Sequence, residues 1–399
     1  MIVWSDDYTG FYGYISAQGG FLGGDGGFVE TSSRINLQAF GMGTVQSFFG
    51  EVGRWLLDPT NVTITAATTT DMSNEGPNPG GGATTPTGNI WYPIDNSVAA
   101  TSQLSVATLN TLLGTGNVAV LTSGPLDRGE PGNITLNAGV TVSWISGNSL
   151  RLLADGNLIL NGSISGGDSG TLELSSSSGG QATQGAASVI SVGGLLLNNL
   201  GGNTLLNGAN VVDRIGARSL SGAVSFRDTG GFNGATGLII SSVISGAVNG
   251  FVNNTSSQTT LGSTTANGIN SSGTVNLTSV GPVTQTQRID MGDGDLCVVT
   301  LNAIGQNILL TNPQNAVRTI SMQTLNATGT APVAANIRFV EESGFAVGQT
   351  ANMGIVTAAG LASLRPGAIT TARPLIPAPG GSVVLTGGAS GDSLRANIS

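Results

Sequence analysis

Short runs of β-favouring residues, separated by turns rich in Gly, Asn and Ser, recur along most of this chain. Between residues 117 and 360 these runs recur about every 16–24 residues. A repeating unit of that size cannot bury its own apolar face and must stack on its neighbours. Such repeats, without helices between them, favour a solenoid of β-strands over a sandwich, which needs longer alternating strands. The clearest runs are residues 133–142, 157–166, 274–283 and 307–317, with others at 172–175, 188–192, 223–226, 237–245 and 336–340.

The composition fits a stack of β-coils. Among the 399 residues, 63 are glycine and only 9% are charged, whereas about 25% charged residues is usual. Val, Ile and Leu can fill the interior of each coil, while Gly and Asn accept the tight corners. The 39% share of hydrophobic residues argues against a disordered chain. We therefore predict an all-β fold, a parallel β-solenoid.

The sequence divides the chain into four parts. Residues 1–65 form the end of a first β-helical segment, and residues 66–97, rich in Pro, Gly and Thr, read as a linker. Residues 98–360 form the main β-helical segment. Residues 361–399, rich in Pro, Gly and Ser, are predicted to be a tail with at most one further strand, Ser382–Leu385. Strands in the first part are expected at residues 2–4, 11–15, 28–29 and 62–64.

One short helix is expected near residues 98–113. Apolar residues there follow helical spacing, and Gly114 supplies a C-terminal stop. We expect this helix to cap the β-segment that follows it.

The residue types that are missing exclude several kinds of chemistry. The chain has no histidine, which excludes Ser-His-Asp and Cys-His catalysis and zinc bound by histidine. The one cysteine, Cys297, lies in an apolar run and is expected to be buried in a strand. The 13 basic residues are scattered arginines and the net charge is −9, so no nucleic-acid partner is expected. No apolar run reaches the length of about 18 residues that a membrane-spanning helix needs.

Two acidic stretches are candidates for Ca²⁺ binding. Asp25 lies in a Gly-Asp-Gly turn, a unit that a calcium roll would repeat in tandem but that occurs once here. Asp290, Asp293 and Asp295 are close together in sequence but lack the Gly and terminal Glu of an EF-hand loop. We predict structural turns at both places, and no metal or cofactor.

Paired carboxylates would be needed for the glycosidase or lyase chemistry of some β-helical proteins. Adjacent residues of a strand point to opposite faces, so a doublet in the sequence is not a catalytic pair. We therefore expect no catalytic residue and no enzyme activity. The pairs considered are Asp6 with Asp7, Glu341 with Glu342, and Asp213 with Arg214.

One stretch resembles a known protein family. Residues 19–64 contain GGFLGGDGGFVETSS and WLLDPTNVTI, which are similar to a block of filamentous-haemagglutinin-like proteins, the exoproteins of bacterial two-partner secretion. The resemblance implies a right-handed parallel β-helix that an outer-membrane transporter exports and that acts as an adhesin. Complete members begin with a signal peptide and a secretion domain, so we expect this chain to be a piece of a larger adhesin. Weaker similarity lies at residues 104–109, 140–144, 150–160, 273–283 and 307–323.

The functional hypothesis that follows is a non-enzymatic adhesin fragment, extracellular or on the bacterial surface. Its rod would bind glycans or proteins of host or bacterial surfaces. A β-helical polysaccharide lyase or glycosidase and a structural spacer of a larger exoprotein remain alternatives. The glycines of residues 19–27 are expected to form corners, and Trp55 to lie buried at the end of the first segment.

Overall fold

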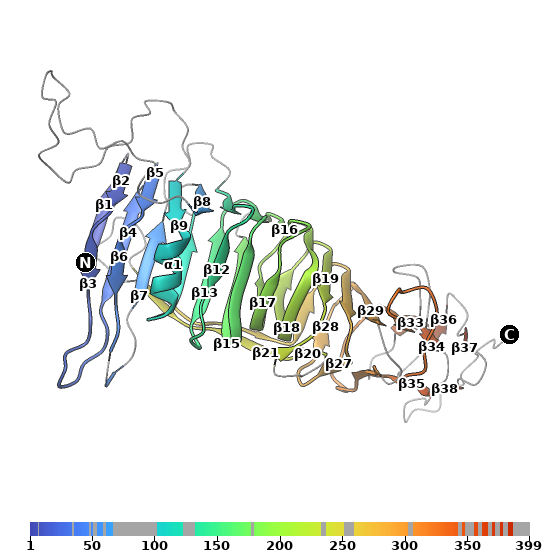
Figure 1. Ribbon diagram of the computed structural model, residues 1–399. Coiled ribbons are helices and arrows are strands. Elements are labelled where there is room, and N and C mark those ends of the chain that lie inside the picture. The colour runs from blue at the N-terminus through green and yellow to red at the C-terminus, as the bar shows by residue number, and fades with distance from the viewer. Residues whose placement is uncertain are drawn as a thin grey trace, which may run out of the picture.

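The computed structural model is a parallel β-solenoid of about 11 turns, with its first strand, β1, and its last strand, β38, at opposite ends of the rod (Figure 1). The predicted all-β fold is thus confirmed. The structure describes residues 1–66 and 102–347, together with the backbone of strands between 355 and 385. Gaps within these ranges are residues 7, 34–35, 48, 51–53, 59–60, 123–131, 177–178, 233–236, 251–258, 302–305 and 342–344. The predicted linker, from residue 67 on, lies outside the described residues.

Each turn contributes to three faces, which we call the first, second and third. The first face contains β1 (Ile2–Ser5), β4 (Phe28–Ser33), β7 (Arg54–Asp58), β10 (Val118–Leu121), β13 (Ser149–Ala154), the later parts of β15 (Ser163–Ser176), β17 (Ile190–Asn198) and β18 (Thr204–Leu220), and then β20 (Leu238–Ile240), β25 (Ile269–Ser271), β27 (Val283–Gln285), β28 (Ile289–Asp290), β30 (Ile308–Leu310), β32 (Ile337–Val340), β35 (Leu361–Arg365) and β38 (Ser382–Leu385).

The second face runs parallel to the first along the rod. It contains β2 (Tyr8–Phe11), β5 (Asn36–Ala39), β9 (Ser102–Ser105), β8 (Val62–Thr65), β11 (Ile134–Leu136), β14 (Leu158–Leu160), β16 (Ala182–Gln184), the start of β18, β19 (Val224–Asp228), β26 (Val275–Ser279), β29 (Asp295–Leu301), β31 (Thr319–Leu325), β33 (Phe345–Val347), β34 (Ile355–Thr357), β36 (Ile369–Thr371) and β37 (Ile376–Pro377). The third face begins with β3 (Tyr14–Ser16), β6 (Met42–Thr44), α1 (Val106–Leu113) and β12 (Thr141–Ser143).

The core is a set of columns in which like residues stack one turn apart. Leu150, Leu172 and Leu195 are consecutive register partners on the first face, and all three are fully buried. Each such side chain contributes about 1.5–3 kcal/mol through burial. Because every turn packs only on its neighbours, the short apolar runs of the sequence suffice to build the rod.

Glycines also stack, at the corner between the first and second faces. A Cβ atom on Gly180, Gly222 or Gly273 would overlap the carbonyl oxygen of the glycine one turn earlier, which is Gly156, Gly202 or Gly222 respectively. Successive corners therefore approach too closely for any side chain. This column explains part of the high glycine content.

The helix is shorter than the sequence predicts and has another role. It begins at Val106 because Ser105 caps it, accepting a hydrogen bond from the backbone N–H of Ala107, while Leu104 belongs to β9. Gly114 is its C-cap, as predicted. The prediction of a cap is wrong: α1 takes the place of a third-face strand, packed between β6 and β12 inside the stack. In the described part of the chain no helix has the length and hydrophobicity needed to cross a lipid bilayer.

The order of strands on the second face departs from sequence order. Strand β9 lies between β5 and β8, although β8 precedes it in the chain (Figure 1). After β8 the chain thus steps back by one rung before it continues. The same hydrogen-bonded ladders therefore join residues 1–65 to residues 102 onward.

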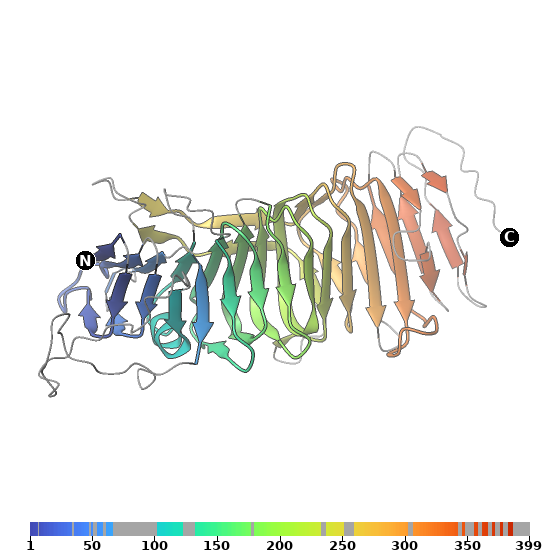
Figure 2. The same cartoon turned by 90° about the horizontal axis from the view of Figure 1, so that it is seen from above.

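A long excursion leaves the first face between β20 and β25. It consists of two antiparallel pairs, β21 (Ser242–Ser245) with β24 (Thr264–Asn267) and β22 (Val248–Gly250) with β23 (Thr259–Leu261). We call residues 242–267 the strap. It runs back along the rod axis over the outside of the first face, where it contacts β15, β17 and β18 and then β4 and β7 (Figure 2).

Three expectations about strands need correction. The expected strand at 11–15 breaks at Tyr12-Gly13 into β2 and β3, because a corner of the coil lies there. The run 237–245 supplies two strands, β20 in the rod and β21 in the strap. Within residues 361–399, where at most one strand is predicted, the structure has β35, β36, β37 and β38.

Candidate binding site

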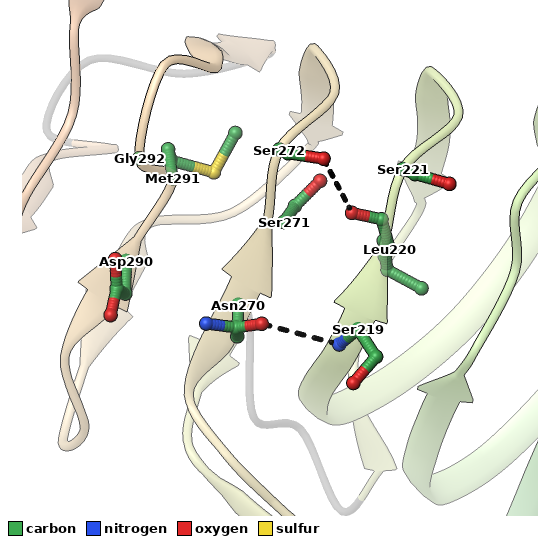
Figure 3. Close-up of a pocket in the computed structure, with 9 residues that line it drawn as sticks. All are labelled: Ser219, Leu220, Ser221, Asn270, Ser271, Ser272, Asp290, Met291 and Gly292. Carbon is green, nitrogen blue, oxygen red and sulfur yellow. Dashed lines mark hydrogen bonds between the residues drawn. The ribbon is translucent and has the colours of Figure 1, made fainter.

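A shallow groove of about 370 Å³ lies at a corner of the rod, beside the point where the strap rejoins it. Three successive turns form it, through the ends of β18, β25 and β28 and the residues after them (Figure 3). The strap fixes this place, since the chain leaves the rod at Ser241 and returns at Gly268, whose N–H donates to the Ser241 carbonyl at 3.1 Å. The groove therefore lies on hydrogen-bonded strands of the rod, at the base of the strap.

Exposed polar side chains form the rim of the groove, and buried side chains lie beneath them. Ser219, Ser221, Asn270 and Ser272 are exposed and Asp290 is half-buried, whereas Leu220, Ser271 and Met291 are buried. Neighbouring turns of a β-ladder are about 4.8 Å apart, so hydroxyl, amide and carboxylate groups follow one another along the rod axis at that spacing. This lining offers donors and acceptors of hydrogen bonds.

Backbone contacts hold the rim in place. Ser219 has a positive φ of 55°, which is uncommon outside glycine and is found preferentially at functional sites. Its N–H donates to Asn270 Oδ1 at 3.3 Å, and Ser272 Oγ donates to the Leu220 carbonyl at 3.4 Å (Figure 3). Two of the polar side chains are thus pre-positioned.

The acidic loop that the sequence singles out borders this groove with one of its residues. Asp290 Oδ2 accepts from Arg288 Nη2 at 2.8 Å, and Asp295 Oδ1 accepts from Arg318 Nη2 at 3.0 Å. Asp290 belongs to the first face and Asp295 to the second, while Asp293 is exposed between them. Within the described ranges no three Asp, Glu or Cys side chains come together as metal ligands.

The other residues considered from the sequence lie apart from one another. Asp25 is exposed in the turn where Gly23 and Gly24 have φ values of 128° and 118°. Cys297 is buried in β29, as predicted. Among the carboxylates, Asp6 is exposed, Glu341 is buried and accepts from the Val317 N–H, and Asp213 accepts from the Phe232 N–H. Asp7 and Glu342 lie outside the described residues.

Asp228 is a buried carboxyl that sequence reasoning missed. It is fully buried at the end of β19 and accepts hydrogen bonds from Ser279 Oγ at 2.8 Å and from the backbone N–H groups of Val212 and Gly230. Burial raises its pKa to about 6, and the Asp213 charge adds to the rise, while the hydrogen bonds oppose it. Because its side chain is sealed from solvent, Asp228 can shape the rod but cannot contact a polysaccharide.

The raised pKa of Asp228 predicts a pH-dependent stability. Its folded-state value lies above the unfolded value of 3.8, so its stabilising contribution is complete below about pH 4 and is lost as pH rises through 6. Asp228→Asn cannot ionise, and Asn210 occupies the register position one turn earlier. We expect the variant to gain on the order of 3 kcal/mol relative to the parent between pH 4 and 7, measured by chemical denaturation. Parallel pH profiles of the two proteins would contradict this.

Arg151 and Glu173 form a buried ion pair that the sequence analysis also missed. They are register partners on the outer side of the first face, and Arg151 Nε lies 2.5 Å from Glu173 Oε2. The strap covers them: Arg151 also donates to the Gly262 carbonyl at 2.8 Å and to Thr264 Oγ1 at 2.7 Å, while Ser245 Oγ donates to Glu173 Oε2. The pair therefore fastens the strap to the rod and has no open side for a ligand.

No protein-family model matches this chain, and a search of curated protein sequences found no significant match.

Proposed function

We propose that this chain is part of a non-enzymatic bacterial adhesin of the haemagglutinin type, extracellular or held on the cell surface. Its parent protein would leave the cell through an outer-membrane transporter of two-partner secretion. Support for the family comes from the glycine-rich block in residues 19–64, and support for a display role comes from the stiff, weakly charged rod. The rod would hold binding groups at fixed spacing for glycans or proteins on host or bacterial surfaces.

The observation that carries this proposal is the polar groove at the base of the strap. Its volume of about 370 Å³ falls in the range of small-ligand pockets and accommodates one or two sugar rings. The exposed hydroxyl and amide groups of Ser219, Ser221, Asn270 and Ser272 can bind sugar hydroxyls. An uncharged glycan suits a groove whose one carboxylate, Asp290, is already paired with Arg288.

We expect the double variant Asn270→Ala/Ser272→Ala to bind such a glycan about 5- to 150-fold more weakly than the parent. Each lost hydrogen bond costs about 0.5–1.5 kcal/mol, and two are removed. Titration calorimetry with neutral oligosaccharides that bind the parent protein on a glycan array measures the change. The matched control is Asn207→Ala/Ser225→Ala, an amide–hydroxyl pair joined at 2.8 Å on another face, which should leave binding unchanged.

The same experiment separates the alternatives. Equal loss of binding in both variants would overturn the groove as the site, and no binding to any glycan or surface protein would favour the spacer. Release of reducing ends or unsaturated products from polysaccharides would instead favour a lyase or glycosidase.

A further inference from the structure

A bulge in β18 borders the groove at the base of the strap. Three steps along β18 face two steps along β25, from Ala217 to Leu220 and from Ile269 to Ser271 respectively. Because of the extra residue, Arg218 and Ser219 together lie opposite Asn270, and the positive φ of Ser219 belongs to the same irregularity. Bulges often lie next to active sites, where they redirect a side chain. Here the bulge brings Arg218 to the rim of the groove, beside Ser219, which lines it (Figure 3).

Arg218 carries a charge that the rod does not compensate. Its side chain is exposed, and it forms no ion pair with any residue that the structure describes. Glu173, two turns earlier, is paired with Arg151. Asp290, two turns later, is paired with Arg288. The guanidinium of Arg218 is therefore free to bind an anionic group of a ligand.

The groove and the guanidinium beside it favour different parts of one ligand. Asp290 is the one charged side chain among the residues that line the groove, and Arg288 neutralises it. The groove itself thus suits a neutral sugar ring. A guanidinium binds a carboxylate through two parallel hydrogen bonds, so Arg218 suits an acidic sugar next to that ring.

The rod axis determines the direction in which such a ligand lies. Neighbouring turns are about 4.8 Å apart, a spacing similar to the length of one sugar ring. A linear glycan that follows the corner of the rod therefore meets roughly one turn with each ring. When a neutral ring lies over Asn270 and Ser272, the next ring towards the N-terminal end lies over the turn that carries Arg218.

We propose that the groove is specific for a linear glycan in which an acidic sugar adjoins a neutral one. The neutral ring binds Asn270 and Ser272, and the carboxylate of the acidic ring pairs with Arg218. This inference rests on the glycan-binding function proposed above, and it adds the class of glycan, its direction along the rod and the residue that selects it.

Titration calorimetry with two forms of one probe tests the proposal. The first form is the hyaluronan tetrasaccharide, in which glucuronate alternates with N-acetylglucosamine, and the second is the same tetrasaccharide with its carboxylates reduced to alcohols. We expect the parent protein to bind the acidic form about tenfold more tightly, the lower end of the effect of charged hydrogen bonds, because Arg218 is exposed. High salt should reduce this difference, since it screens exposed charges.

Two variants assign the difference to one residue. With Arg218→Gln the two forms should bind equally, at the affinity that the parent protein has for the reduced form. The matched control is Arg214→Gln, which removes an exposed arginine of the same strand that does not border the groove, and it should keep the preference for the acidic form.

The outcomes separate this inference from the function on which it rests. Equal binding of the two forms by the parent protein would overturn the role of Arg218 and leave neutral glycan binding in the groove intact. Binding of neither form would also overturn it, whereas the glycan-binding function fails only when neutral oligosaccharides on the array do not bind either. An equal loss in the Arg214 variant, or weaker binding of the reduced form by the Arg218 variant, would show a general effect of charge or of shape and would contradict the proposal.

Discussion

Replacement of Arg151 by Ala is expected to lower the free energy of unfolding of the strap region by about 3–5 kcal/mol. The guanidinium is buried, pairs with Glu173 and donates to Gly262 and Thr264 of the strap. Its removal leaves the Glu173 carboxylate, which is fully buried, without its cationic partner. Hydrogen exchange should show loss of protection in the strap and in strands β13, β15 and β17 below it, and proteolysis within residues 242–267 should accelerate.

Two further variants decide whether the ion pair itself is responsible. Arg218→Ala removes an exposed arginine of the same face and should change stability by less than about 0.5 kcal/mol. Arg151→Met/Glu173→Leu replaces both charges with apolar side chains and should recover most of the loss, since apolar replacement of a buried ion pair is often neutral. A single variant Arg151→Ala as stable as the parent would contradict the fastening role.

The repeat architecture could be predicted from the sequence because its cause is local. Runs such as Leu150–Leu153 and Leu172–Leu174 carry the apolar spacing of one rung, and the register joins them 22 residues apart. The step back at β9 has no such local cause. It depends on pairing of Gln103 with both Gln38 and Thr63, and these polar residues resemble many others in the chain.

The strap and its fastening were not predictable for a related reason. Arg151 and Glu173 do show a usable pattern, opposite charges at one outward position of consecutive turns, each between leucines. The strap that covers the pair shows no such sequence pattern. It binds the pair through backbone carbonyls and hydroxyl groups that lie up to 113 residues away in the chain. Likewise Leu196 looks like one more core leucine, yet it points outward and packs on Val243 and Ala266 of the strap.

The site itself was predictable only in part. The acidic loop of residues 290–295 borders the groove, but its sequence suggested metal binding rather than a polar groove. Ser219 lies one turn before Asn270 and Ser272, and it is 51 residues from Asn270 in the sequence because the strap intervenes. A single serine in a serine-rich chain does not indicate a binding site. Only the strand register shows that this serine lies beside an amide and a carboxylate.

Trp55→Ala is expected to destabilise the first turns of the rod by about 3–5 kcal/mol. The Trp55 ring is fully buried, meets Phe11 edge-on at a centroid distance of 5.2 Å, and donates from Nε1 to Thr31 Oγ1 at 2.8 Å. A Cβ on Gly43 would overlap the same ring, so the surrounding turns are built to its size. The truncation leaves both a cavity and a buried hydroxyl that loses its donor.

The size and the reach of this effect can be measured separately. Trp55→Phe keeps most of the ring and should cost about 1–2 kcal/mol, while Trp4→Ala, at a position 43% exposed, should cost less than 1 kcal/mol. Because each turn of a solenoid contacts only its neighbours, hydrogen exchange should increase in residues 1–66 and stay unchanged in β15, β17 and β18. Equal loss of protection along the whole rod would show that the coil unfolds as one unit and would contradict the nearest-neighbour account of its stability.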